Sequence, residues 1–261
     1  MNITSKIFIY FIITIRLTML SIAAQAETTN CKTISVIPTT INSPGIYCFK
    51  SNLNSNIANG SAITIAANDV VIDLNGYKLN GCASGASALS SGISSQFRRN
   101  ITVKNGTIEG YMIGISLAGF RSPSEGEGNI VEDIRAVRNF QIGIDVQGNG
   151  IIVRNNYVAS TGGSTAFGKI PLAGLGIGAH GKGARVLNND IVSTKRGKQG
   201  TSTGISLQGF VDNTDGLAVN NRITGADVGI IFQDGSSKFR DNLTSDVKTP
   251  YVSGTDAGNN N

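Results

Sequence analysis

Ile151-Ile-Val-Arg-Asn-Asn-Tyr-Val158 and Ala184-Arg-Val-Leu-Asn-Asn-Asp-Ile191 are two copies of one pattern. Each copy is a short alternating apolar run, an Asn or Asp at a corner, and a second short run. The same pattern recurs in Ile101-Thr-Val-Lys-Asn-Gly-Thr-Ile108, Ile130-Val-Glu-Asp-Ile-Arg-Ala-Val137 and Leu217-Ala-Val-Asn-Asn-Arg-Ile223. Because side chains alternate across a strand, we expect one residue of each copy to point inward, namely Val103, Val131, Val153 and Val186.

A second series of short motifs interleaves with the first and supplies a third strand to each repeat. It consists of Gly-Ile pairs at Gly92-Ile93, Gly114-Ile115, Gly143-Ile144, Gly176-Ile177, Gly204-Ile205 and Gly229-Ile230, separated by 22, 29, 33, 28 and 25 residues. Two interleaved repeats of this length indicate a solenoid of stacked coils.

The repeats predict an all-β fold, a single right-handed parallel β-helix of about seven coils. A left-handed hexapeptide helix would show a strict six-residue repeat, and the chain has none. The corner Asn residues are expected to bond to their copies in neighbouring coils, as stacked amides do. We assign residues 27–62 to an N-terminal cap, 63–247 to the β-helix and 248–261 to a polar tail, with Gly254–Asn261 as a loose terminus.

Residues 1–26 have the features of a signal peptide. Two apolar runs lead to Ala24-Gln25-Ala26, which has the small-x-small form of a cleavage site. Arg16, inside the apolar stretch, argues against the alternative, an uncleaved membrane anchor. We therefore expect an exported protein, periplasmic or secreted, that has no membrane contact after cleavage.

The charge balance of the cleaved chain is mild. Without Lys6 and Arg16, 20 of the 22 Lys and Arg residues remain against 17 Asp and Glu, a net charge of +3. This net charge is too small to indicate a nucleic-acid partner. Separately, we expect the protein to be a monomer. One basic loop, Lys195-Arg196 with Lys198, could contact an acidic polymer or could be an ordinary solvated loop.

Three cysteines in an exported chain leave one unpaired. Cys31 and Cys48 flank a short segment before the first clear coil, and we predict a disulfide between them. Cys82 is then expected to be a free, buried thiol. The alternative pairing of Cys48 with Cys82 stays open.

Two stretches carry a resemblance to a known family. Val71-Ile-Asp-Leu-Asn-Gly-Tyr-Lys-Leu-Asn-Gly81 and Asn100-Ile-Thr-Val-Lys-Asn-Gly106 resemble the opening coils of the right-handed β-helix, pectin-lyase-like superfamily. The resemblance covers about residues 63–242. It implies a carbohydrate-directed role, but the superfamily includes lyases, hydrolases, epimerases and proteins without known activity, so it does not fix the reaction.

The signatures of the enzymes in that superfamily are mostly missing. Polygalacturonase-like enzymes carry an Asn-Thr-Asp motif, then Asp-Asp, then Gly-His-Gly; this chain has Asn213-Thr-Asp215 and Ala179-His-Gly181 in reverse order, and no Asp-Asp. Asp-Pro-His-Asp is absent, and the aspartates are scattered rather than clustered as calcium ligands. No Cys/His group has zinc spacing, so we expect neither a metal nor a cofactor.

The outward positions of the Gly-Ile strands form the candidate site. In register they read Ser94, Ser116, Asp145, Gly178, Ser206, Ile231, and two residues further Gln96, Ala118, Gln147, His180, Gln208, Gln233. The candidate catalytic residues are His180, Asp145 and Lys182, and the candidate substrate-binding residues are Gln147, Gln208, Lys169 and Arg196. The loops Thr161–Gly174 and Lys195–Thr203 are expected to wall this groove.

These residue types fit the chemistry of a uronic-acid lyase or epimerase. Such an enzyme needs a base, here His180 or Lys182, and a cation that neutralises the sugar carboxylate, here Arg185 or Lys169. The alternative is a structural amide ladder, with His180 and Asp145 paired on a solvated face. At the level of the whole protein, the alternatives to an enzyme are a carbohydrate-binding module without turnover, which the absence of Trp disfavours, and a structural or surface β-helix protein.

Overall fold

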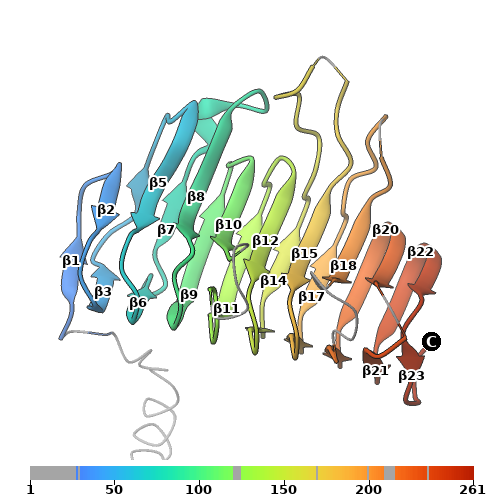
Figure 1. Cartoon of the computed structure of the whole chain (residues 1–261). Helices are drawn as coiled ribbons and strands as arrows, with labels where there is room; N and C mark the ends of the chain where they lie inside the picture. Colours follow the sequence, from blue (N-terminus) through green and yellow to red (C-terminus); the bar gives the residue numbers. More distant parts are fainter. Residues whose placement is uncertain are drawn as a thin grey trace, which may run out of the picture.

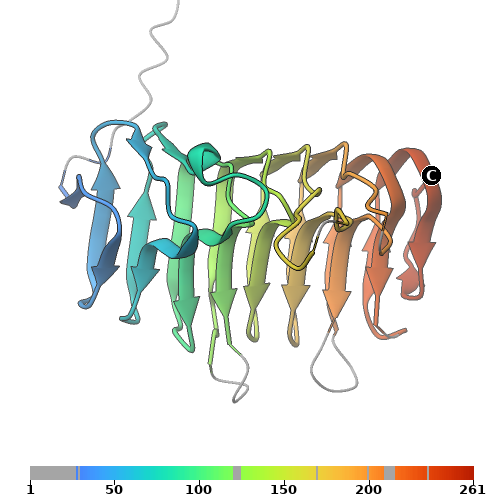
Figure 2. The ribbon, with the colours of Figure 1, turned by 90° about the horizontal axis from the view of Figure 1, so that it is seen from above.

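The computed structural model describes residues 28, 30–119, 125–168, 170–198, 200–208, 215–233 and 235–261. The predicted signal segment and Lys169 therefore lie outside the described residues. The described part is a single parallel β-helix, and its strands join in one 23-stranded sheet in which every printed pairing is parallel. The coils follow one another along the axis as a row of parallel arrows (Figure 1, Figure 2).

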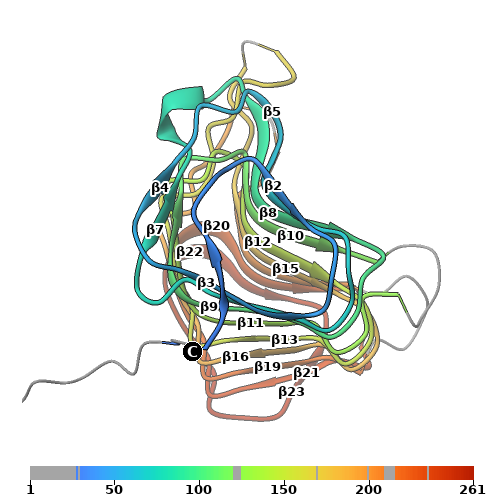
Figure 3. The same cartoon turned by 90° about the vertical axis from the view of Figure 1, so that its left-hand side faces the viewer.

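The view along the axis shows that the coils enclose a three-sided core (Figure 3). The first wall contains β1 (Lys32–Ile34), β3 (Gly45–Phe49), β6 (Val70–Asp73), β9 (Ile101–Glu109), β11 (Ile130–Val137), β13 (Ile152–Arg154), β16 (Arg185–Leu187), β19 (Leu217–Val219), β21 (Lys238–Arg240) and β23 (Thr255–Asp256).

The second wall is built of shorter strands and of the continuations of longer ones. It contains β4 (Leu53–Asn54), β7 (Lys78–Asn80), the second halves of β9 and β11, β14 (Tyr157–Ala159), β17 (Asp190–Val192) and the first parts of β20 (Arg222–Phe232) and β22 (Leu243–Val252).

The third wall contains the Gly-Ile strands. It consists of β2 (Thr39–Ile41), β5 (Asn59–Ile65), β8 (Leu89–Gln96), β10 (Ile113–Ala118), β12 (Ile142–Gln147), β15 (Leu175–His180), β18 (Thr203–Gln208) and the later parts of β20 and β22. One short 3-10 helix, η1 (Cys82–Ser84), lies between β7 and β8.

The predicted register of the repeats is confirmed. The isoleucines of the six Gly-Ile pairs lie opposite one another from β8 to β20 and are all buried, as Ile93, Ile115, Ile144, Ile177, Ile205 and Ile230. The valines Val103, Val131, Val153 and Val186 form a second buried column on the first wall. Repetition of one aliphatic residue per coil thus builds a continuous core.

The corner between the first and second walls is made by residues in the left-handed backbone region. Asn75, Asn105, Asp133, Asn155, Asn188, Asn220 and Asp241 all have φ between 48° and 57°. Asn and Asp tolerate this region better than other residues with a side chain. In the later coils the residue after this corner is an Asn, and these side chains form an amide ladder. Each side-chain N–H donates to the side-chain oxygen of the next coil, through Asn156, Asn189, Asn221, Asn242 and Asn260.

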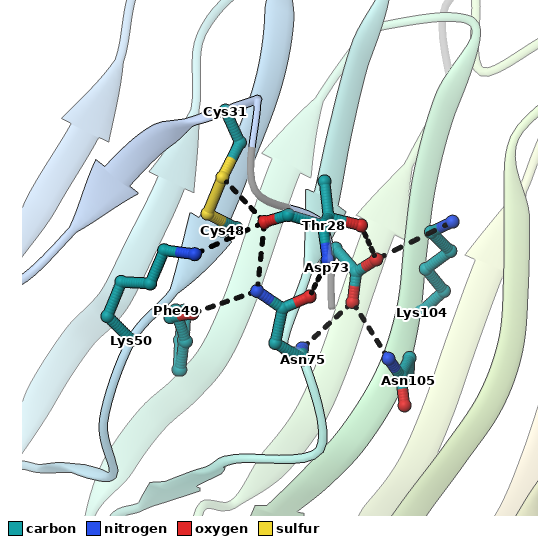
Figure 4. Close-up of a disulfide and its surroundings, with 9 residues drawn as sticks. All are labelled: Thr28, Cys31, Cys48, Phe49, Lys50, Asp73, Asn75, Lys104 and Asn105. Atoms are coloured by element: carbon teal, nitrogen blue, oxygen red, sulfur yellow. Dashed lines mark hydrogen bonds and ion pairs between the residues drawn. A yellow bond between two sulfur atoms is a disulfide. The ribbon is translucent and has the colours of Figure 1, made fainter. Parts of the chain in front are cut away.

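The segment expected to be a separate cap takes part in the parallel pairing. β1 pairs with β3 and β2 with β5, so the ladder already runs through residues 32–62. A disulfide joins Cys31 to Cys48, and Thr28 donates a hydrogen bond to the buried Asp73 (2.5 Å, Oγ1 to Oδ2), as Figure 4 shows.

Cys82 is a free thiol but is exposed, so the expectation that it is buried was wrong. It lies in η1, outside the coil walls, in a connection that the repeat pattern does not describe.

The predicted polar tail is also wrong. β22 runs to Val252 and pairs with β20, and β23 pairs with β21, so residues 248–256 extend the coils. Asn260 and Asn261 then accept hydrogen bonds from Asn242 and Thr244. The last residues carry the corner Asn motif once more, and their ladder bonds hold them in place.

Within the described ranges, no helix has the length and apolar character needed to cross a bilayer.

Candidate functional site

The site is built on the third wall, at the ends of β12 and β15. In the register of this wall, Asp145 lies opposite Gly178 and Gln147 lies opposite His180, so Asp145 and His180 are diagonal neighbours. The ring Nε2 of His180 is 3.1 Å from Oδ1 of Asp145. The Gln147 side-chain amide donates to the other carboxylate oxygen, Oδ2, at 2.9 Å. The three side chains are named here the Asp145 cluster.

Gly178 makes room for this arrangement. A Cβ placed on Gly178 would lie 2.6 Å from Asp145 Oδ1 and 2.8 Å from His180 Nε2. The glycine therefore lets the carboxylate and the imidazole meet above the sheet instead of being separated by a side chain.

The Asp145 cluster is largely shielded from water. Asp145 is 8% exposed and Gln147 6%, and the His180 side chain is 15% exposed. The pairing of His180 with Asp145 that the structural alternative expected is observed, but the pair is not on a solvated face. Gly126, which lies between β10 and β11, packs directly against the Gln147 backbone carbonyl at the end of β12, where an added Cβ would lie 2.0 Å from the oxygen.

One polar atom of the cluster lacks a partner. The side-chain oxygen of Gln147, Oε1, is buried and accepts no hydrogen bond. Buried acceptors are almost always satisfied, by protein or by another molecule. The oxygen has less than 1 Å² of accessible surface, so a ligand group would reach it only if the surrounding side chains moved.

Two further predicted residues lie at the same edge. Gln208 is the register partner of His180 on the next coil and is exposed. Lys182 follows His180 by two residues; it is exposed and its Nζ lies 3.8 Å from an oxygen of Asp215. The structure thus gathers Asp145, Gln147, His180 and Gln208 at one edge of the third wall, with Lys182 just beyond it.

The predicted walls of the groove are not where the sequence suggested. The loops Thr161–Gly174 and Lys195–Thr203 lead into the first residues of β15 and β18, whereas His180 and Gln208 are the last residues of these strands. Five residues of strand, about 16 Å, separate the two ends. In Figure 1 these loops lie at the upper edge, and the arrowheads of β15 and β18 point to the lower one. The expectation overlooked the chain order: both loops directly precede their strands, which places them at the end opposite to His180 and Gln208.

Arg196, predicted to bind the same substrate, belongs to a different cluster. Its guanidinium is 2.5 Å from Oδ1 of the buried Asp227, and Lys248 lies 3.2 Å from the same oxygen. Ser202 donates to Oδ2 from both its backbone N–H (3.1 Å) and its hydroxyl (2.9 Å).

The Asp227 carboxylate is strongly held in its charged form. Burial raises its pKa, but the hydrogen bonds from Ser202 and Lys248 and the charge of Arg196 outweigh that effect and lower the pKa to about 2. The sequence pointed to Arg196 through its basic loop but gave no signal for Asp227 or Lys248, which come from other coils.

Among the residues that the structure describes, no group of three or more His, Cys, Asp or Glu side chains is placed to hold a metal ion. The chain was compared with protein-family models, with curated proteins and with solved structures, and none of these comparisons gave a match.

Proposed function

We propose that this chain is an exported β-helix protein that acts on an acidic polysaccharide at the Asp145 cluster. The observation that carries the proposal is the 3.1 Å contact between Asp145 and His180, supported by Gln147 and placed at the edge of an extended wall. The resemblance of residues 63–242 to the pectin-lyase-like superfamily supports the substrate class, and the reaction would be that of a lyase or an epimerase.

The chemistry follows from the orientation of His180. A carboxylate that accepts a hydrogen bond from one ring nitrogen fixes the proton there and places the lone pair of the neutral imidazole on the other nitrogen. His180 would then remove the proton beside the sugar carboxylate. Lys182, long and exposed, would neutralise that carboxylate and stabilise the charge that develops.

The amides support binding along the wall. Exposed Gln208 offers an amide donor and acceptor to sugar hydroxyls, and Gln147 supports the site through its hydrogen bond to Asp145. The same amides favour the second candidate, a carbohydrate-binding protein without turnover. In that case Asp145 and His180 serve only to hold the polymer.

The test uses the mature protein with alginate, polygalacturonate and neutral glycans. Unsaturated ends report a lyase, NMR of the polymer reports an epimerase, and reducing ends report a hydrolase. We expect turnover on a uronic-acid polymer, abolished in His180→Ala and Asp145→Asn. Asp190→Asn, which removes a carboxylate from the second wall of the same coil, is the control and should leave turnover intact.

The outcomes separate the two candidates. Polymer binding without turnover, lost in His180→Ala, supports the binding protein and rejects the enzyme. If both variants keep all binding and turnover, the Asp145 cluster is structural and the site is misassigned.

Export is part of the same proposal. Cleavage after Ala26 would leave Glu27 as the first residue, and the Cys31–Cys48 disulfide suits an oxidising compartment. Mass spectrometry of the exported protein should find Glu27 at its terminus. An intact Met1 on exported protein would reject cleavage.

A further inference from the structure

The loop between β14 and β15 presents apolar side chains to solvent at its tip. Phe167 is 69% exposed and Ile170 45%, and Pro171 is half-buried. Phe167 is the only aromatic residue among the large hydrophobic side chains that the described part of the chain exposes. Single exposed hydrophobic residues are common on proteins, whereas these lie together on one loop. We call Phe167, Ile170 and Pro171 the Phe167 tip.

Backbone hydrogen bonds hold the base of this loop. Gly163 donates to Leu172 O and Leu172 donates to Ser164 O, both at 2.9 Å, which closes the loop as a narrow hairpin. Thr165 donates to Ala86 O, also at 2.9 Å, and so ties the loop to an earlier coil. In Figure 1 and Figure 3 the loop rises beyond the edge of the coils. The tip therefore projects from a fixed base instead of folding back onto the strands.

Two lysines without a carboxylate partner lie beside the loop. Lys198 donates from its backbone N–H to Pro171 O at 3.1 Å, and Lys195 donates in the same way to Thr161 O, at the base of the loop. Both lysines are exposed, and within the described ranges neither side chain makes an ion pair or a hydrogen bond. The two neighbouring loops that carry these residues contain no Asp or Glu. Both cations are therefore available to an external anion.

The acidic side chains nearby do not cancel this charge. Asp227 is already shared by Arg196 and Lys248, and Asp246 is exposed and offsets one charge. With the two lysines beside the loop, these residues make four cations against two carboxylates, a net charge of +2. Towards the earlier coils the same edge has Glu109, which is buried and pairs with two cations of its own. The edge around the Phe167 tip is therefore positive.

We propose that the Phe167 tip attaches the mature protein to a membrane surface that carries anionic lipids. Phe167 and Ile170 would enter the headgroup region, while Lys195 and Lys198 contact lipid phosphates. The contact is peripheral, needs no spanning helix, and differs from the sequence-based expectation of no membrane contact after cleavage. It does not depend on the reaction proposed at the Asp145 cluster.

The shape of the tip favours a lipid surface over a sugar polymer. Binding sites for small polar units are hollows lined by the protein, whereas Phe167 and Ile170 project outward, and one of the two is aliphatic. A bilayer surface accepts projecting apolar side chains, and its phosphates complement the charge of the two lysines.

The absence of Trp from the chain gives a direct test. In the mature Phe167→Trp protein, the fluorescence of the single indole should shift to the blue on addition of vesicles made of phosphatidylglycerol and phosphatidylcholine in equal parts. Vesicles of phosphatidylcholine alone should bind more weakly, by about fivefold for each lysine at the surface. Val36→Trp is the control, because Val36 is 71% exposed between β1 and β2 and should not respond. An emission that anionic vesicles leave unchanged in Phe167→Trp would overturn the proposal.

Co-sedimentation with the same vesicles compares further variants. Phe167→Ala should weaken binding at least about tenfold, the effect of burying one aromatic side chain, and should leave the melting temperature unchanged. Lys198→Gln should weaken binding about fivefold. Lys238→Gln removes the same charge from an exposed position on the first wall and should have little effect. Equal binding by wild type and Phe167→Ala would place the contact elsewhere and reject the tip.

Three more outcomes decide between partners. If the Phe167→Trp emission responds to polygalacturonate but not to vesicles, the tip binds the polymer and the lipid proposal is wrong. If the wild type sediments as a dimer that Phe167→Ala abolishes, and vesicles do not bind, the tip is an interface between two copies. His180→Ala should bind vesicles as the wild type does, whatever its turnover, and loss of vesicle binding in this variant would contradict an independent site.

Discussion

Gly178 shows how one missing side chain can create a contact between two others. The sheet register puts Gly178 opposite Asp145, and both the carboxylate and the imidazole of His180 occupy the space above it. Gly176, two residues earlier, is also buried, but its Cβ position faces backbone: Gly204 O at 2.5 Å. Gly178 thus leaves room for two side chains, whereas Gly176 allows the backbone of the next coil to approach closely.

Their substitution should separate function from stability. In Gly178→Ala the new methyl meets side-chain atoms of Asp145, His180 and Leu175 and no backbone, so the fold should tolerate it while the Asp145–His180 contact is broken. Turnover or polymer binding should then fall at least about tenfold with little change in melting temperature. Gly176→Ala should instead lower the stability strongly, because a backbone carbonyl cannot give way. Equal activity of Gly178→Ala and wild type would argue against a role for the pair.

Asp227 predicts a pH dependence of stability. Its folded pKa of about 2 lies below the ordinary value of 3.8, so the charged form is favoured by folding. The stabilisation, about 2 kcal/mol, is present above about pH 4 and is lost as the pH falls through about 2. Asp227→Asn should therefore be less stable than wild type at pH 7, and the difference should shrink across that acid window.

Denaturant unfolding at several pH values measures this effect. Asp190→Asn, on the second wall, controls for the loss of one carboxylate. A stability difference for Asp227→Asn that stays constant down to pH 2 would contradict the assigned pKa.

At the scale of elements, the short strands are held in place by their corners. A first-wall strand such as β13 or β16 has only three residues, too few to fix its own register. The register is set by the buried amides: Asn189 donates to Val153 O, Leu187 O and Asn221 Oδ1 and accepts from Asn156. Each amide connects its own corner to those of neighbouring coils.

Asn189→Ala should therefore be costly. Removing the side chain leaves several buried polar groups without partners, and we expect a loss of about 3 kcal/mol in the free energy of unfolding. Asn188→Gly is the matched control: Asn188 is exposed, has φ of 56°, and glycine adopts that conformation freely, so the loss should stay below about 1 kcal/mol. Chemical denaturation of both variants checks the contrast, and similar losses would show that the ladder adds nothing beyond corner geometry.

At the scale of the whole molecule, the pairing extends towards both termini. At the N-terminal side, Thr28 bonds to Asp73 and Asn75 across the coils, next to the Cys31–Cys48 disulfide. At the C-terminal side, β23 covers β21, and the aromatic rings of Phe232, Phe239 and Tyr251 stack inside the last turns. The final residues are thus part of the solenoid.

Deletion of residues 255–261 should destabilise the protein. It removes β23, exposes Phe239, and takes the Asn260 acceptor from Asn242. We expect the melting temperature to fall by about 5 °C or more. Asn260→Ala should reproduce part of the fall, whereas exposed Asn259→Gly should have little effect. A deletion variant that melts like the full chain would restore the picture of a loose tail.

The sequence by itself determined the repeat, and the repeat determined the walls, the buried isoleucine and valine columns and the corner amides. It did so because each of these features depends on residues within one coil and recurs in the next. The juxtaposition of Asp145 and His180 was also predictable, since they occupy adjacent outward positions on neighbouring coils of one wall.

Only the tertiary structure decided what lies around these residues. It packs Gly126 against the end of β12, and it pairs Arg196 with Asp227, which also contacts Lys248. It also leaves Cys82 exposed in η1 and pairs the last strand with β21. Non-repeating connections and chain ends have no copy in the next coil to reveal their position. Their place follows from packing and charge pairing between residues that are far apart in the chain.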